Sequence, residues 1–257
     1  MEIVIICTVA FLVAILTFFS GFGLGTILTP IFMIFFPVDL AIALTGVVHF
    51  FNNVFKIILV GKNADKSVVF RFGLPAVIAA FFGAWVLLHI PDSSPLFVYE
   101  MGGKTFEVYP VKFLISILLI IFAIMDLLPY FDKLEFGKEK LPIGGLLSGF
   151  FGGLSGHQGA LRSAFLIKAG LSKEVFIGTA VVVSTLVDFT RLGVYSTRFA
   201  QSDLIDNLPL VTFATLSAIT GAYLGNILLK KVTFRFLQLT VAIMLVLISI
   251  ALGLGLI

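Results

Sequence analysis

The residues best suited to chemistry lie in one stretch near the middle of the chain, LSGHQGALRSA at 154–164. Its two glycines leave backbone N–H groups accessible, and a histidine, a glutamine and an arginine accompany them. Hydrogen-bond donors around a positive charge are suited to holding an anion. The chain offers no nucleophile with a base at usable spacing, no metal-ligand cluster and no cofactor motif. We therefore expect anion binding at this stretch, without catalysis, a metal or a cofactor.

These polar residues lie within a chain that has the composition of a polytopic membrane protein. Of its 257 residues, 60% are hydrophobic and 12% are charged, far from the averages of soluble domains. Two apolar pieces, 26–36 and 143–168, are too short or too interrupted to form a simple span. The stretches long enough, as helices, to cross about 30 Å of hydrocarbon are 2–19, 39–60, 68–90, 111–129, 172–195, 207–229 and 233–257.

The positive charges indicate how the two irregular pieces are arranged. If 2–36 and 141–170 are hairpins that enter and leave on the same side, eleven Lys and Arg residues fall in loops on one side and three on the other. Short loops rich in Lys and Arg stay in the cytoplasm. We therefore expect both chain termini on the extracytoplasmic side. Single crossings would instead place two basic loops outside.

This arrangement predicts an all-α fold of two inverted repeats, each a membrane-embedded helical hairpin followed by three transmembrane helices. A shift of 135 residues pairs Asn53 with Asp188 and Lys56 with Arg191, and inverted repeats are typical of transporters. The first repeat, 1–130, would hold the hairpin 2–36, the spans 39–60, 68–90 and 111–129, and an external β-hairpin-like loop at 91–110. After a cytosolic linker at 131–140, the second repeat, 141–257, would hold the hairpin 141–170 and the spans 172–195, 207–229 and 233–257.

Both predicted hairpins turn at a glycine-rich motif, FFSGFGLGT at 18–26 and FFGGLSGHQGA at 150–160. As a helix, the limb 26–36 is about 16 Å long, so the first turn would lie deep in the membrane. Irregular backbone is tolerated there only where it is buried in protein or lines a cavity, and the start of the next limb offers free N–H groups. The alternative is that these glycines only let helices pack closely.

We expect the anion site to combine residues from both turns. Backbone N–H groups would come from Gly21, Gly23, Gly25, Gly156 and Gly159. Neutral hydrogen bonds would come from Ser20, Thr26, Ser155 and Gln158. Arg162 would supply the compensating charge, because an arginine in a spanning region is costly and this one is too far from its helix end to reach the interface easily. His157 would carry a coupled proton.

Other intramembrane polar residues have two interpretations each. His49, Asn52 and Asn53 would face the pocket or make hydrogen bonds between helices. Asp188 lies one helical turn from Arg191, which favours a local ion pair over a role in coupling. Lys56 and Arg191 lie near the ends of their predicted helices, so extension of the side chain to the membrane surface explains them as well as function does.

Three segments, SGFGLG, GGLSGHQGALRSAFLIKAGLSKE and VDFTRLGVY, resemble the sulfite exporter TauE/SafE family, and the similarity covers essentially the whole chain. The resemblance implies a bacterial or archaeal inner-membrane secondary transporter for anions such as sulfite, sulfoacetate, thiosulfate or organosulfonates. Many relatives carry consecutive glycines where His157 and Gln158 stand here, which leaves the substrate open. One repeat would rock against the other to carry the anion, and a passive anion channel is the alternative.

The expected partners follow from this interpretation. They are a small sulfur-containing anion, a coupled proton or sodium ion, the lipid bilayer and a second copy of the chain in a homodimer. Nucleic acid is not expected, because the basic loops are too short to form a binding surface.

Overall fold

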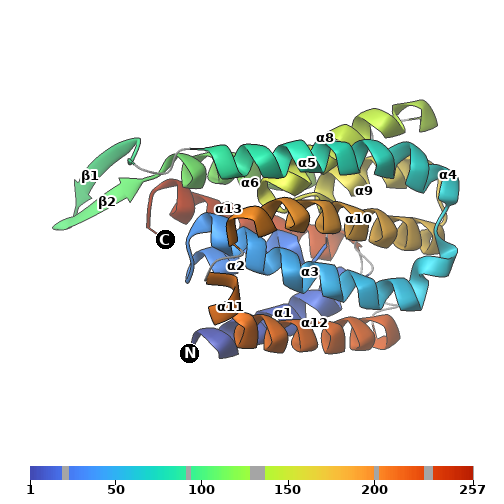
Figure 1. The fold of residues 1–257 in the computed structure, drawn as a ribbon, viewed down its shortest axis with the longest axis horizontal. Coiled ribbons are helices and arrows are strands. Elements are labelled where there is room, and N and C mark those ends of the chain that lie inside the picture. Colours follow the sequence, from blue (N-terminus) through green and yellow to red (C-terminus); the bar gives the residue numbers. More distant parts are fainter. Residues whose placement is uncertain (19–22, 91–93, 128–136, 200–202, 229–233, 257) are drawn as a thin grey trace.

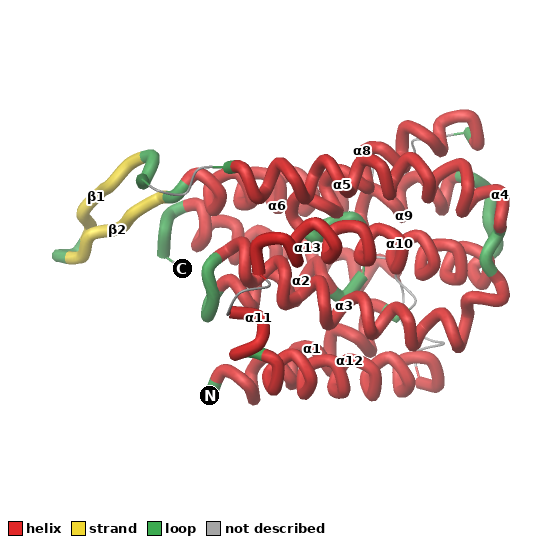
Figure 2. The backbone as a smooth tube through the Cα atoms, viewed as in Figure 1, coloured by secondary structure: helices red, strands yellow, loops and turns green. Residues whose placement is uncertain are grey.

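The computed structural model of the chain is a bundle of long and short helices with a small β-hairpin at one end (Figure 1). Figure 2 shows how little of the described backbone lies outside helices. The structure describes residues 1–18, 23–90, 94–127, 137–199, 203–228 and 234–256. The all-α prediction is confirmed.

The first half of the chain forms the helices α1 (Glu2–Thr17), α2 (Gly25–Met33), α3 (Val38–Val60), α4 (Lys66–Val68), α5 (Leu74–His89) and α6 (Pro110–Leu127). A 3₁₀ turn at Gly61–Asn63 follows α3, and a π-helical turn at Val69–Gly73 leads into α5. The strands β1 (Phe97–Met101) and β2 (Lys104–Val108) pair antiparallel inside the loop expected to form a β-hairpin.

The second half forms α8 (Leu141–Ser155), α9 (Gly159–Lys168), α10 (Lys173–Phe199), α11 (Asp203–Asp206), α12 (Leu208–Leu228) and α13 (Phe234–Gly253). A 3₁₀ turn at Lys138–Lys140 precedes α8. Both ends of the chain lie at the same end of the bundle as the β-hairpin, and α4 lies at the opposite end (Figure 1).

Long apolar helices account for the membrane character of the fold. Among the described residues, four stretches are long and apolar enough to cross a membrane: Val38–Asn63, Lys66–His89, Lys173–Thr197 and Leu208–Ile227. Shorter apolar helices lie at Glu2–Thr17, Pro110–Ile124 and Ala242–Gly253. Large apolar side chains such as Ile58, Phe189 and Leu247 are more than half exposed on the bundle surface, where lipid tails would cover them.

Each predicted hairpin is a pair of contacting helices, α1 with α2 and α8 with α9. Gly156 caps the C-terminal end of helix α8, and its φ of 79° is left-handed and therefore suits glycine. Gly23, two residues before α2, also has a positive φ, 83°. The nine residues of α2 make a helix about 14 Å long, so its start lies about half a membrane thickness from its end.

Helix packing joins the two halves of the chain. Helix α1 packs against α12, and α8 packs against α5. Helix α3 packs against α10, and α6 packs against α13. Three glycines one turn apart face α5 from α8, namely Gly145, Gly149 and Gly153. A Cβ on any of them would come within 2.2 Å of a backbone oxygen of α5 or of the π-helical turn before it. These glycines therefore serve close packing, as small residues do in membrane bundles.

Candidate functional site

The two glycine-containing turns meet inside the bundle. The Nε2 atom of His157, the second residue after α8, lies 3.2 Å from the backbone oxygen of Thr26 in α2. Its Nδ1 atom lies 2.8 Å from the backbone oxygen of Ser155. A Cβ on Gly25 would stand 3.3 Å from the backbone oxygen of Gly156. The structure thus brings together the turns from which we expected the site to be built.

Each turn also touches a charged residue of the bundle. A Cβ on Gly23 would lie 2.9 Å from Nε2 of His49 and 3.8 Å from Nη2 of Arg162. A Cβ on Gly156 would lie 3.0 Å from Nη1 of Arg191. Because both glycines have positive φ, only glycine combines this backbone geometry with such close approach.

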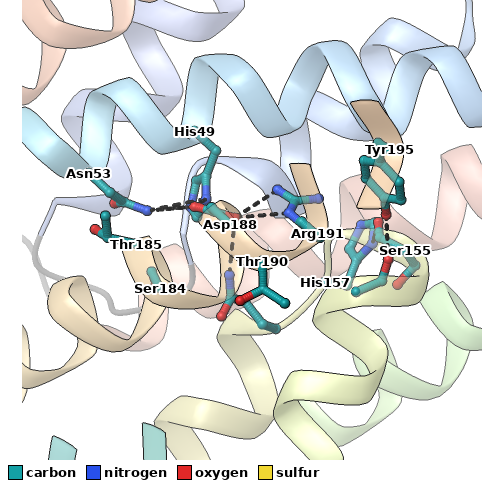
Figure 3. A network of polar contacts seen from close by, with 12 residues as sticks. His49, Asn53, Ser155, His157, Ser184, Thr185, Asp188, Thr190, Arg191 and Tyr195 are labelled. Carbon is teal, nitrogen blue, oxygen red and sulfur yellow. Dashed lines mark hydrogen bonds and ion pairs between the residues drawn. The ribbon is translucent and has the colours of Figure 1, made fainter. Parts of the chain in front are cut away.

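Asp188 of α10 is the centre of a buried hydrogen-bond network (Figure 3). Its Oδ2 lies 2.6 Å from Nδ1 of His49 and accepts a hydrogen bond of 3.2 Å from Nδ2 of Asn53. Its Oδ1 accepts hydrogen bonds from Nε of Arg191 at 2.9 Å and from Nε2 of Gln158 at 3.4 Å. We call His49, Asn53, Gln158, Asp188 and Arg191 the Asp188 cluster.

The Asp188 cluster joins α3, the second turn and α10. The expected ion pair between Asp188 and Arg191 is present. Both side chains are 0% exposed, and Lys56 is 3% exposed. The alternative that Arg191 and Lys56 reach the membrane surface is therefore wrong, because both side chains turn into the bundle.

A small cavity lies beside this cluster, and we call it the cation cavity. Its polar lining consists of Thr17, Gly23, Asn53, Lys56, Arg162 and Ser184, and Phe18 and three apolar residues of α10 complete it. The cavity holds about 280 Å³ of empty space, part of it open to solvent. The space open to the centre of a water-sized sphere is about 20 Å³, which is room for a water molecule or a small ion and none for a drug-sized ligand.

Two cations contribute to the cation cavity. Arg162 of α9 is 2% exposed, and its Nη1 donates a hydrogen bond to Oγ of Ser184. The ammonium group of Lys56 lies 5.4 Å from the centroid of the Phe18 ring, within the range of a cation–π interaction. Arg162 thus extends from the second hairpin towards Gly23 of the first.

The remaining expected site residues lie elsewhere or make other bonds. Ser155 donates its hydroxyl to the backbone oxygen of Phe151, one turn back in α8. Asn52 is buried, and neither its amide nitrogen nor its amide oxygen has a hydrogen-bond partner in the described part of the chain. Gly159 is the first residue of α9. Ser20 and Gly21 lie outside the described residues.

Ser184 and Tyr195 were not singled out from the sequence, and for Lys56 a functional role and extension to the membrane surface were left equally open. Tyr195 donates its hydroxyl to the backbone oxygen of Gly153. The signal that could have found them is helical spacing. Ser184 and Tyr195 stand four residues before and seven after Asp188, on the buried face of α10.

Comparison with known proteins identifies the family. The model of the family described as Sulfite exporter TauE/SafE matches residues 6–252, nearly the whole chain. Searches of curated proteins and of solved structures find no match. The family consists of membrane transporters of sulfite and related anions. With its apolar helices and buried cations, the chain therefore belongs to the sulfite exporter TauE/SafE family and is a multi-pass membrane transporter rather than an enzyme.

Proposed function

We propose that the protein is a secondary transporter of a sulfur-containing anion in the plasma membrane of a bacterium or archaeon, and that the anion binds in the cation cavity. The candidates are sulfite, sulfoacetate, thiosulfate and organosulfonates. Family membership supports the chemical class. The observation that carries the site is the burial of Arg162 in a cavity where the second hairpin meets Gly23 of the first.

Arg162 has the chemistry that this role requires. Its planar guanidinium can bind two oxygens of one oxyanion at once. The hydrogen bond with Ser184 orients the group. A buried arginine is costly in a membrane, and a bound anion offsets that cost. The amide of Asn53 and the backbone at Gly23 offer further donors around the same space.

Alternating access needs two bodies that enclose the site, and an inverted repeat would supply them. The helix packing supports this arrangement. Suppose that α1, α3, α5 and α6 of the first half correspond in order to α8, α10, α12 and α13 of the second. The contact of α1 with α12 then corresponds to the contact of α8 with α5. The contacts of α3 with α10 and of α6 with α13 each correspond to themselves, with the two helices exchanged. In this proposal both termini lie outside the cytoplasm, opposite the basic residues Lys62 and Lys66. A homodimer stays a prediction.

His157 is our candidate for the coupled proton. Both ring nitrogens face backbone oxygens, one in its own hairpin and one in the other. A neutral imidazole can donate only one N–H, whereas the protonated ring donates to both oxygens. Protonation therefore favours the state in which the turns touch. Arg191 beside Gly156 opposes that charge, and the ring of Phe122 in α6 stacks over the histidine.

The test is flux of radiolabelled sulfite into proteoliposomes with and without an imposed proton gradient. We expect wild-type protein to accumulate sulfite against its gradient. The His157→Gln variant should carry sulfite downhill only, because its amide cannot take up a proton. A passive channel would dissipate a sulfite gradient without ever accumulating the anion. Absence of any anion flux would contradict the proposed function.

A further inference from the structure

The geometry points to a more specific substrate class: the cation cavity binds an anion that carries two negative charges, and Lys56 supplies the second positive contact. This inference rests on the proposed function, because it takes the cavity to be the transport site. It divides the candidate substrates. Thiosulfate and fully deprotonated sulfite carry two charges, whereas a simple organosulfonate carries one.

Lys56 is the second cation at the cavity. Its side chain comes from α3, is buried, and lines the same cavity as Arg162 of α9. The ammonium group lies over the ring of Phe18, 5.4 Å from its centroid. A cation–π contact is weaker than the cost of removing an ammonium group from water. The ring therefore offsets only part of the cost of burying Lys56.

Positive charge exceeds negative charge among the buried side chains that the structure describes. Among the buried side chains that the structure describes, the Lys and Arg residues are Lys56, Arg162 and Arg191, and the carboxylate is Asp188. Both oxygens of Asp188 already bind groups of the Asp188 cluster. The described lining of the cavity contains two cations and no carboxylate. Residues 19–22, between Phe18 and Gly23 in the sequence, are FSGF and contain no acidic side chain.

The two cations of the cavity also act on each other. Lys56 and Arg162 line the same cavity, and like charges repel where water screens them poorly. Asp188 also attracts Arg162, but the three buried cations that the structure describes exceed this one carboxylate by two charges, and a singly charged anion neutralises one of them. An anion with two charges neutralises both, and therefore gains one additional buried charge interaction over a singly charged anion of similar size.

The experiment compares thiosulfate, which has two charges, with methanesulfonate, a singly charged anion of similar size. The affinity of purified wild-type protein for each is measured by calorimetry in detergent. We expect thiosulfate to bind at least about tenfold more tightly, a difference that one buried charge interaction readily produces. Equal affinities for the two anions would overturn the dianion inference and leave the anion site standing.

Variants of Lys56 test whether this residue supplies the second positive contact to the anion. Lys56→Met keeps the length and apolar character of the side chain but removes the charge, so it should lose about tenfold or more of its thiosulfate affinity and keep most of its methanesulfonate affinity. Lys56→Gln is the second variant in case methionine impairs folding. Lys62→Met is the matched control, because Lys62 is an exposed lysine just beyond the end of α3.

The outcomes separate the two proposals. An equal loss of both anions in Lys56→Met, or the same shift in Lys62→Met, would overturn the role of Lys56. If the Lys56 variants do not fold, the ratio of wild-type affinities still decides whether the site prefers two charges. If folded wild-type protein bound neither anion nor sulfite, the proposed function itself would fail.

Discussion

The Asp188 cluster and the cation cavity lie next to each other and share Asn53, but they differ in how their charges are balanced. In the Asp188 cluster the carboxylate binds Arg191 and His49 directly. In the cation cavity, Lys56 and Arg162 face a space whose described lining has no carboxylate. Both regions are equally buried, so burial does not distinguish them.

The difference indicates which charges belong to the fold and which to a ligand. A buried charge with an opposite charge inside the protein stabilises the folded state only as long as its partner is present. Where the lining of a cavity contains cations and no carboxylate, a bound anion is the partner that stabilises those cations most. Removing a charge from the first region should therefore affect folding, and removing one from the second should affect binding.

The largest expected effect is that of Asp188→Asn. This change leaves Arg191 buried without its carboxylate, which costs about 3–5 kcal/mol in comparable cases. We expect most of the variant to be lost from the membrane, and the remainder to melt well below wild type in a fluorescence size-exclusion assay. Combining it with Arg191→Gln should recover part of the stability, because both charges are then absent. A single variant as stable as wild type would remove the distinction between the two regions.

The next effect is that of Arg162→Ala on anion affinity. Loss of a buried, charge-assisted contact costs about 2–5 kcal/mol, so sulfite binding should fall by at least about 30-fold. Arg162→Lys should restore part of it, because a point charge cannot replace the planar fork. The melting temperature without anion should stay the same or rise. Arg191→Ala should unfold the protein. If Arg162→Ala unfolds it as well, Arg162 stabilises the folded state and is not a ligand of the anion.

A smaller effect should follow from Gly23→Ala. The left-handed backbone at Gly23 costs a non-glycine residue about 1–2 kcal/mol, and the new Cβ would lie 2.9 Å from Nε2 of His49. Transport should fall because the first turn must move away from the cavity. Gly103→Ala is the matched control, since Gly103 has a φ of 75° but a Cβ there would meet nothing within 4 Å. Similar transport loss in both variants would attribute the effect to backbone strain alone.

Most of the helix positions follow from apolar length in the sequence. The stretches predicted to cross the membrane overlap the observed helices, and the short limb before Pro37 is indeed a half-length helix. The end of α2 at Met33 rather than at residue 36 was not predictable, because no charge or strong helix breaker marks it. The β-hairpin follows from Gly102 and Gly103, whose positive φ angles suit a tight turn.

The site was predictable by residue type but not by contact. His49, Asn53, Gln158, Asp188 and Arg191 all stood out as polar groups in apolar helices. That His49 binds a carboxylate 139 positions away depends on how α3 packs against α10, which spacing along one helix does not determine. Because Lys56 lies near the end of its predicted helix, extension of its side chain to the membrane surface was one of two expectations for it. Its rotational position, seven residues after His49 and three after Asn53, would have indicated the buried face.

The proposed anion site lies between Lys56 and Arg162, and not in the Asp188 cluster. Selenite is a chemical analogue of sulfite whose heavier central atom can be located by anomalous diffraction. In crystals grown with selenite, our account predicts the strongest anomalous peak inside the cation cavity, within hydrogen-bonding reach of Arg162. A peak beside Arg191, or an empty cation cavity at a selenite concentration that saturates binding in solution, would contradict the account.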